Sequence, residues 1–243
     1  MQNAHIRYQF RLFRYTLVAI FVLWKSVVPT YAQQVLHMEE HDQKRFYFGI
    51  TLASNQSNYK LTHSDLFLKS DSIMVAEPLR TFGFNLGLLA NMRLNDRFDL
   101  RFNPQLVFAN KNLYYREKYP DWHDTEKKVE SILVSFPLQV KFKSDRFGNF
   151  RVYTIAGMKF DYDLASNDRA RRAEDLVKVK KSDYGYEVGA GFEFYFPNFI
   201  FAPEFKISNG IGNVHVRDKN LRYSNVVEQL QSRMLVFSIH LEG

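Results

Sequence analysis

Cysteine is absent from the 243-residue chain, and that absence excludes several classes of protein at once. It excludes a disulfide framework, an iron–sulfur cluster, a cysteine nucleophile and the lipid-modified cysteine of a bacterial lipoprotein. A strong excess of one charge is also missing. The formal net charge is +7, but residues 1–32 contain four of the 33 basic residues and no acidic one. The remaining 29 Lys and Arg stand against 26 Asp and Glu, so no nucleic-acid partner is indicated.

Long hydrophobic runs are confined to the N-terminus. Residues 1–14 are basic, residues 15–28 are apolar apart from Lys25, and small residues lead up to Ala32. This order is typical of a secretory signal peptide cleaved after Ala32, with an uncleaved membrane anchor as the alternative. No later uncharged run is long enough for a transmembrane helix. We therefore expect an exported protein that helices do not hold in a membrane.

The rest of the chain shows a period of two. In residues 98–108, Phe98, Leu100 and Phe102 alternate with Asp99 and Arg101. Side chains of a strand point alternately to its two faces, so each such segment predicts a strand with one apolar and one polar face. The pattern occurs in eight segments: 45–54, 81–92, 98–108, 129–143, 150–162, 183–196, 199–208 and 233–241.

The connections between these segments alternate between long and short. Those near 93–97, 144–149 and 197–198 are short and rich in turn residues, whereas the others are long and polar: 55–80, 111–128, 163–182 and 209–232. Such sorting is typical of an outer-membrane barrel with short periplasmic turns and long extracellular loops. We predict an all-β fold, an eight-stranded antiparallel up-and-down transmembrane β-barrel. Its parts are a signal peptide over 1–32, a periplasmic N-terminal tail over 33–44 and the barrel over 45–243.

The size of the apolar side chains decides which face is outside. The interior of an eight-stranded barrel is only just wide enough to be filled by side chains, so the many large apolar groups must face lipid. The opposite face then supplies a lumen with nearly balanced charges. We expect a structural network of ion pairs there, formed by Asp99, Arg101, Lys141, Lys143, Arg151, Lys159, Asp161, Asp183, Glu187, Glu193, Glu204 and Lys206. An ion or proton pathway is the alternative use of these charges. Pro104, Pro137 and Pro203 lie inside three strands, where bulges could accommodate them.

Two patterns could indicate catalysis, and neither is convincing. His37 to His41 matches the H-x-x-E-H arrangement of a zinc peptidase, but it falls in a short polar tail that we expect to be solvated. Ser238 and His240 are two residues apart and are predicted to face inward, whereas a barrel enzyme that cuts lipids needs its Ser and His near a rim and facing lipid. We therefore expect no catalytic residue, no metal and no cofactor. Tyr114, Tyr115 and Trp122 in a long loop fit either a binding surface or an aromatic girdle.

Four long stretches resemble the PorT family, called SprT in gliding bacteria. They are GFNLGLLANMRLNDRFDLRFNPQLVFANKNLYY (83–115), KKVESILVSFPLQVKFKSDR (127–146), DYGYEVGAGFEFYFPNFIFAPEFKIS (183–208) and SNVVEQLQSRMLVFSIHLE (224–242). The resemblance implies a non-enzymatic outer-membrane component of the type IX secretion system, which exports proteins that carry a C-terminal sorting domain. It also implies other secretion components as partners. Outer-membrane lipid is the partner expected of the barrel wall. The basic residues of the connection 163–182, among them Arg169, Arg171 and Arg172, fit either pairing with lipopolysaccharide phosphates or a solvated loop. It implies no catalytic or ligand residue.

Two other functions remain open on the sequence. One is a generic small barrel for adhesion or membrane integrity, in which the extracellular loops act. The other is a lipid-modifying barrel enzyme that would use Ser238 and His240. The oligomeric state is not indicated.

Overall fold

The computed structural model describes residues 35–64, 67, 73–117, 123–127, 130–165, 179–216 and 227–243. The signal peptide predicted over 1–32 lies outside these residues. So do several loop residues considered above, among them Trp122. Within the described ranges, no helix has the length and apolar character needed to cross a bilayer.

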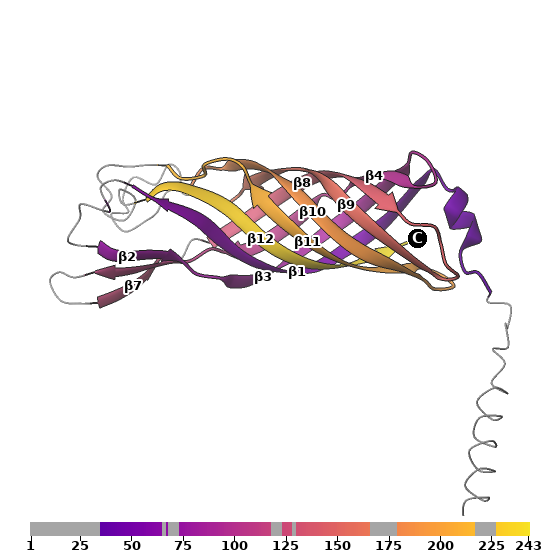
Figure 1. Ribbon diagram of the computed structural model, residues 1–243, viewed down its shortest axis with the longest axis horizontal. Helices are drawn as coiled ribbons and strands as arrows, with labels where there is room; N and C mark the ends of the chain where they lie inside the picture. Colours follow the sequence, from indigo (N-terminus) through magenta and orange to yellow (C-terminus); the bar gives the residue numbers. More distant parts are fainter. Residues whose placement is uncertain are drawn as a thin grey trace, which may run out of the picture. The chain divides into compact units, whose positions relative to one another are not determined.

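The main sheet closes on itself as an antiparallel barrel (Figure 1). Its order is β1-β12-β11-β10-β9-β8-β4-β3-β5, and β1 pairs with both β12 and β3. β4 and β5 share one position between β3 and β8, so the nine segments make a ring of eight and confirm the predicted fold. The segments are β1 (Phe46–His63), β3 (Thr81–Arg93), β4 (Phe98–Phe102), β5 (Gln105–Asn110), β8 (Glu130–Lys143), β9 (Phe150–Asp163), β10 (Ser182–Tyr195), β11 (Ile200–Gly210) and β12 (Val227–Glu242).

The two faces of the wall differ as the alternation predicts. In β4, Phe102 is 42% exposed on the outer face, whereas its neighbour Arg101 is fully buried in the lumen. Aromatic rings also meet on the outer face, where Phe84 stacks on Phe108 with ring centroids 4.6 Å apart. An apolar outer wall around a polar interior is the arrangement that a bilayer requires.

The three prolines interrupt hydrogen bonds without changing the register. Pro104 separates β4 from β5, yet both segments pair with β8 in one continuous register, and the Pro104 carbonyl still accepts from the Leu88 N–H at 2.9 Å. Pro137 remains opposite Lys159 in β9, and Pro203 lies beside a gap in the β10–β11 pairing. The suggestion that bulges accommodate them is wrong, because the pairings on either side of each proline keep the same offset.

The end of the barrel with long connections is more ordered than the sequence suggested. β1 continues to His63 and β12 begins at Val227, so parts of the expected loops 55–80 and 209–232 are strand. A separate three-stranded sheet, β2 (Ile73–Pro78), β6 (Leu113–Glu117) and β7 (His123–Lys127), projects from this end (Figure 1). Parts of the connections expected over 55–80, 111–128 and 209–232 are therefore strand.

An apolar cluster, which we call the cap, explains that order. It brings together side chains from β1, β2, β6, β12 and two connections: Tyr59, Ala76, Leu113, Tyr115, Val179, Val214, Val227 and Leu230. Tyr59 and Leu230 point into the barrel on their strands, so the cap fills the end of the lumen that carries the long connections, which is expected to be extracellular. Burial of these apolar side chains stabilises strand segments whose neighbouring residues are polar. Those polar residues hide the strand pattern in the sequence.

Candidate functional site

The charged residues predicted to face the lumen do so. Asp99, Arg101, Lys141, Arg151, Lys159, Glu187, Glu193, Glu204 and Lys206 are all buried, with at most 8% of each residue exposed. Isolated buried charges would be very costly, so their pairing decides whether the barrel is stable.

Near the end of the lumen with the short turns, which is expected to be periplasmic, two cations are held by three carboxylates. Arg101 contacts Glu204 at 2.6 Å and Glu242 at 3.3 Å. Lys141 pairs with Glu193 and lies 3.7 Å from Glu242. Glu242 thus bridges the two cations. Glu242 was not predicted because the last strand was expected to end at residue 241, although its parity matches that of His240.

Tyrosine hydroxyl groups complete this part of the network. Tyr47 donates to Asp99 at 2.6 Å, and Lys143 pairs with the same carboxylate at 2.8 Å. Tyr153 donates to Glu204 at 3.0 Å, and its ring lies 4.3 Å from the Lys141 ammonium. These rings occupy volume that water would otherwise fill, while their hydroxyl groups satisfy buried acceptors.

Farther along the lumen the charges are paired more locally. Lys206 contacts Glu187 at 3.2 Å, and Lys159 contacts Asp161 at 2.5 Å. The Asp161 carboxylate also accepts from Ser135 at 2.5 Å. The predicted lumen charges are therefore brought together as short-range pairs, an arrangement suited to filling the barrel.

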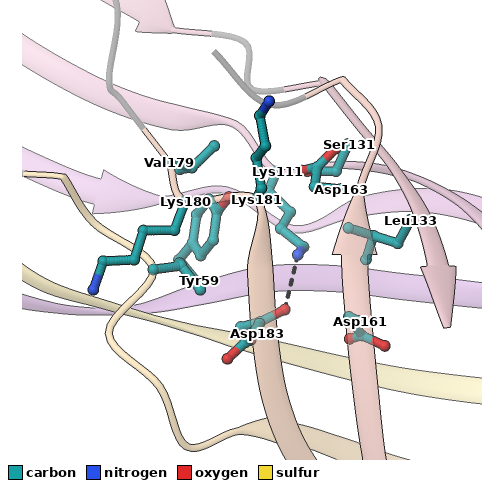
Figure 2. Close-up of a pocket in the computed structure, with 12 residues that line it drawn as sticks. Tyr59, Lys111, Ser131, Leu133, Asp161, Asp163, Val179, Lys180, Lys181 and Asp183 are labelled. Carbon is teal, nitrogen blue, oxygen red and sulfur yellow. Dashed lines mark hydrogen bonds between the residues drawn. The ribbon is translucent and has the colours of Figure 1, made fainter. Parts of the chain in front are cut away.

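A small cavity lies against the cap, whose Tyr59 and Val179 are among the residues that line it (Figure 2). Asp161, Asp163, Asp183 and the buried Lys111 line it, and Lys111 donates to Ser232 at 2.8 Å. The centres of water molecules could occupy a volume of about 20 Å³ in this cavity. That is room for one or two waters, so the cavity is too small for an organic substrate.

Ser238 and His240 lie inside the lumen, away from the lipid face. One ring nitrogen of His240 is 2.9 Å from the Thr51 hydroxyl, and the other is 3.4 Å from Glu204. Ser238 is fully buried on the same side of β12. A lipid substrate on the outer wall would not reach either residue.

The N-terminal tail packs against the rim that carries the short turns, which is expected to be periplasmic, and the expectation that the tail is solvated is wrong for its central residues. Glu39–Gln43 form a single 3₁₀ turn, η1, beside the short turns of the barrel (Figure 1). His41 is 3% exposed and packs edge-on against Tyr47, with ring centroids 4.5 Å apart. Burial lowers the pKa of His41 to about 4. We call residues 36–44 the strap.

Three arginines of the barrel hold the strap, and we call Arg93, Arg146 and Arg151 the socket. Asp42 contacts Arg146 at 2.9 Å, Arg151 at 3.1 Å and Arg93 at 3.8 Å. Although partial burial opposes ionisation, the guanidinium groups of Arg151 and Arg146 hold the pKa of Asp42 below its usual value. Of the H-x-x-E-H motif, His41 is thus used for packing while Glu40 is exposed. No group of three potential metal ligands occurs among the described residues.

Comparison with known proteins supports the architecture. The sequence profile of the outer membrane protein beta-barrel domain family matches residues 31–216. The chain belongs to this family. The outer membrane β-barrel domain accounts for the closed sheet and its apolar outer wall, and the protein is an integral protein of the bacterial outer membrane.

Several solved structures are similar to this outer membrane β-barrel. OprG from Pseudomonas aeruginosa has a TM-score of 0.45 at 15% identity, covering 81% of this chain and 93% of OprG. Neisserial surface protein A has a TM-score of 0.45 at 17% identity, covering 81% and 96%. Ail of Yersinia pestis has a TM-score of 0.37 at 14% identity, covering 82% and 100%. No curated protein matches the sequence significantly.

Proposed function

We propose that this outer membrane β-barrel is a non-enzymatic accessory component of the type IX secretion system. The observation that carries the proposal is a lumen filled with paired charges, with the cap at one end and the strap at the other. A barrel filled in this way acts through the surfaces it presents at its two rims. Contact with other secretion components is a function that needs only such surfaces.

The resemblance to the PorT family supports this particular assignment. The resembling stretches include the strands that supply the network, such as β4 with Arg101 and β10 with Glu193. The partners proposed are other secretion components, outer-membrane lipid and lipopolysaccharide. The lumen charges act structurally in this proposal.

Deletion of the gene, followed by mass spectrometry of secreted and periplasmic fractions, tests the proposal. Proteins with C-terminal sorting domains should accumulate in the periplasm, and the wild-type gene should restore their export. The Arg101→Met variant should neither fold as a barrel nor restore export. Arg97→Gln should restore export, because Arg97 makes only an exposed ion pair with Asp145. Normal export in the deletion strain, with no related barrel present, would refute the role.

Adhesion is a second candidate because a separate sheet projects on the extracellular side. Tyr115 is fully buried in the cap, so its replacement would report on folding. Tyr114 in the same strand is only partly buried and suits a test of surface binding. Loss of attachment with normal secretion in Tyr114→Ala would favour adhesion, and the reverse result would favour the secretion role.

A further inference from the structure

The strap is held in a way that resembles peptide recognition. The socket reads one carboxylate and two main-chain carbonyls: Arg93 donates to the carbonyl of His41 at 3.2 Å, and Arg146 donates to the carbonyl of His37. In return, the side-chain oxygen of Asn149 accepts the His37 N–H at 2.9 Å. Contacts to the main chain fix the path of a peptide and place few demands on its sequence.

The sequence-dependent part of the contact is small. It consists of the Asp42 carboxylate among three guanidinium groups and the ring of His41, which lies between Tyr47 and Tyr195. Glu39 and Glu40 are exposed, so they contribute charge near the socket without a fixed position. A planar ring followed directly by a carboxylate is therefore the feature that this site selects.

The strap is also weakly fastened. η1 is a single turn without a side-chain cap at its N-terminus, and Met38 before it has a positive φ of 53°. His41 is the buried residue of this turn. Segments with few buried contacts open at low free-energy cost, so the socket can be vacated without unfolding the barrel.

We propose that the periplasmic rim is a docking site for an acidic peptide segment of a periplasmic protein, in which a planar ring residue precedes Asp or Glu. The strap occupies this site in cis and competes with that segment. Charge complementarity favours an acidic partner, because three guanidinium groups face one carboxylate of the strap. An anionic lipid headgroup could meet the arginines but would leave the space of the His41 ring empty. The proposal does not depend on the secretion role.

Spin labelling of the full chain in zwitterionic nanodiscs tests the proposal. The chain has no cysteine, so Glu40→Cys provides one labelling site on an exposed position. Asp42→Asn and Arg146→Gln should each raise the mobile fraction of the label several-fold. Arg97→Gln, on the same rim but outside the socket, should leave it unchanged. Heat-modifiable migration on gels verifies in each case that the barrel is folded.

The probe for docking in trans is a fluorescent peptide with the sequence of residues 36–43. It should bind the Asp42→Asn chain at least tenfold more tightly than the wild-type chain, whose own strap competes. It should not bind Arg146→Gln, and a peptide with Asn in place of its Asp should bind at least tenfold more weakly.

Three results would overturn the proposal. The first is a label that stays immobile in Asp42→Asn, because the socket would then not hold the strap. The second is a peptide whose affinity is the same for all folded variants. The third is release of the wild-type strap by phosphatidylglycerol in the nanodisc without peptide, which would assign the socket to lipid headgroups.

Discussion

The two ends of the lumen are closed by different physical means. At the extracellular end, the cap buries apolar side chains from strands and connections that are far apart in the sequence. At the periplasmic end, the strap is one short turn held mainly by Asp42 and the socket. Apolar burial is not weakened by ionic screening, whereas partly exposed ion pairs are. The cap is thus a permanent part of the fold, and the strap is a part that can detach.

The largest effect is expected from truncating the cap. Leu113 is fully buried there, and Leu113→Ala should lower the free energy of unfolding by about 2–5 kcal/mol. Urea unfolding in lipid vesicles, followed by tryptophan fluorescence, measures this loss at low and high salt. Leu94→Ala, at an exposed position in a periplasmic turn, is the control and should change stability by less than about 0.5 kcal/mol. A loss that depends strongly on salt would contradict an apolar cap.

The second effect is release of the strap by acid. Burial lowers the pKa of His41 from its usual 6.5 to about 4 in the docked strap. The free strap therefore binds a proton below pH 6.5 while the docked strap does not, so docking is strongest above 6.5 and weakens as the pH falls toward 4. The lowered pKa of Asp42 acts in the same direction, but only below its usual value of 3.8. At pH 5 the contribution of His41 is about 2 kcal/mol.

The charged groups around His41 determine the size of that effect. Glu193 and Asp42 favour its protonation, whereas Arg93 and Lys44 oppose it. The mobile fraction of a label at Glu40→Cys should rise between pH 7.5 and 5. His41→Phe keeps a ring in the same place and should remove this dependence. A pH profile that is unchanged in His41→Phe would show that another group is responsible.

A smaller effect is expected from salt on the strap. Asp42 is about 30% exposed, so each of its ion pairs contributes only about 0–1 kcal/mol, and salt reduces that contribution. Raising the salt concentration should increase strap release in the wild-type chain. Asp42→Asn should show a shallower dependence, because the carboxylate that salt screens is gone. Equal salt dependences of strap release in the wild-type and Asp42→Asn chains would show that the charge of Asp42 does not hold the strap.

Much of the barrel could be predicted because one local rule governs it. The period of two assigns each wall residue to lipid or lumen, and it placed Arg101 and Phe102 on opposite faces as observed. Glu242 was missed only because the end of β12 was set one residue too early. The lumen residues could thus be listed from the sequence, but their pairing could not, since it depends on which strands face each other across the barrel.

The cap and the docked strap were not predicted from the sequence, for different reasons. Polar residues such as Asn58 and Lys60 interrupt the pattern near Tyr59, although β1 continues through them because β12 pairs with it. The strap shows no periodicity, and Asp42 meets Arg146 and Arg151, each more than 100 residues away in sequence. Contacts of that range are set by the closed sheet, which brings the short turns to the same rim as the tail.

The smallest effect is expected where a rim arginine has no part in the strap. Arg97 pairs with Asp145 at 3.2 Å, but both side chains are mostly exposed, so solvent screens the interaction. Arg97→Gln should leave strap mobility unchanged, and it should alter the free energy of unfolding by less than about 0.5 kcal/mol. Arg146→Gln removes the same charge from the same rim but also removes one of the contacts of Asp42 and the side-chain contact to the His37 carbonyl. If both variants released the strap equally, general charge at the rim would hold it, and the specific geometry of the socket would not.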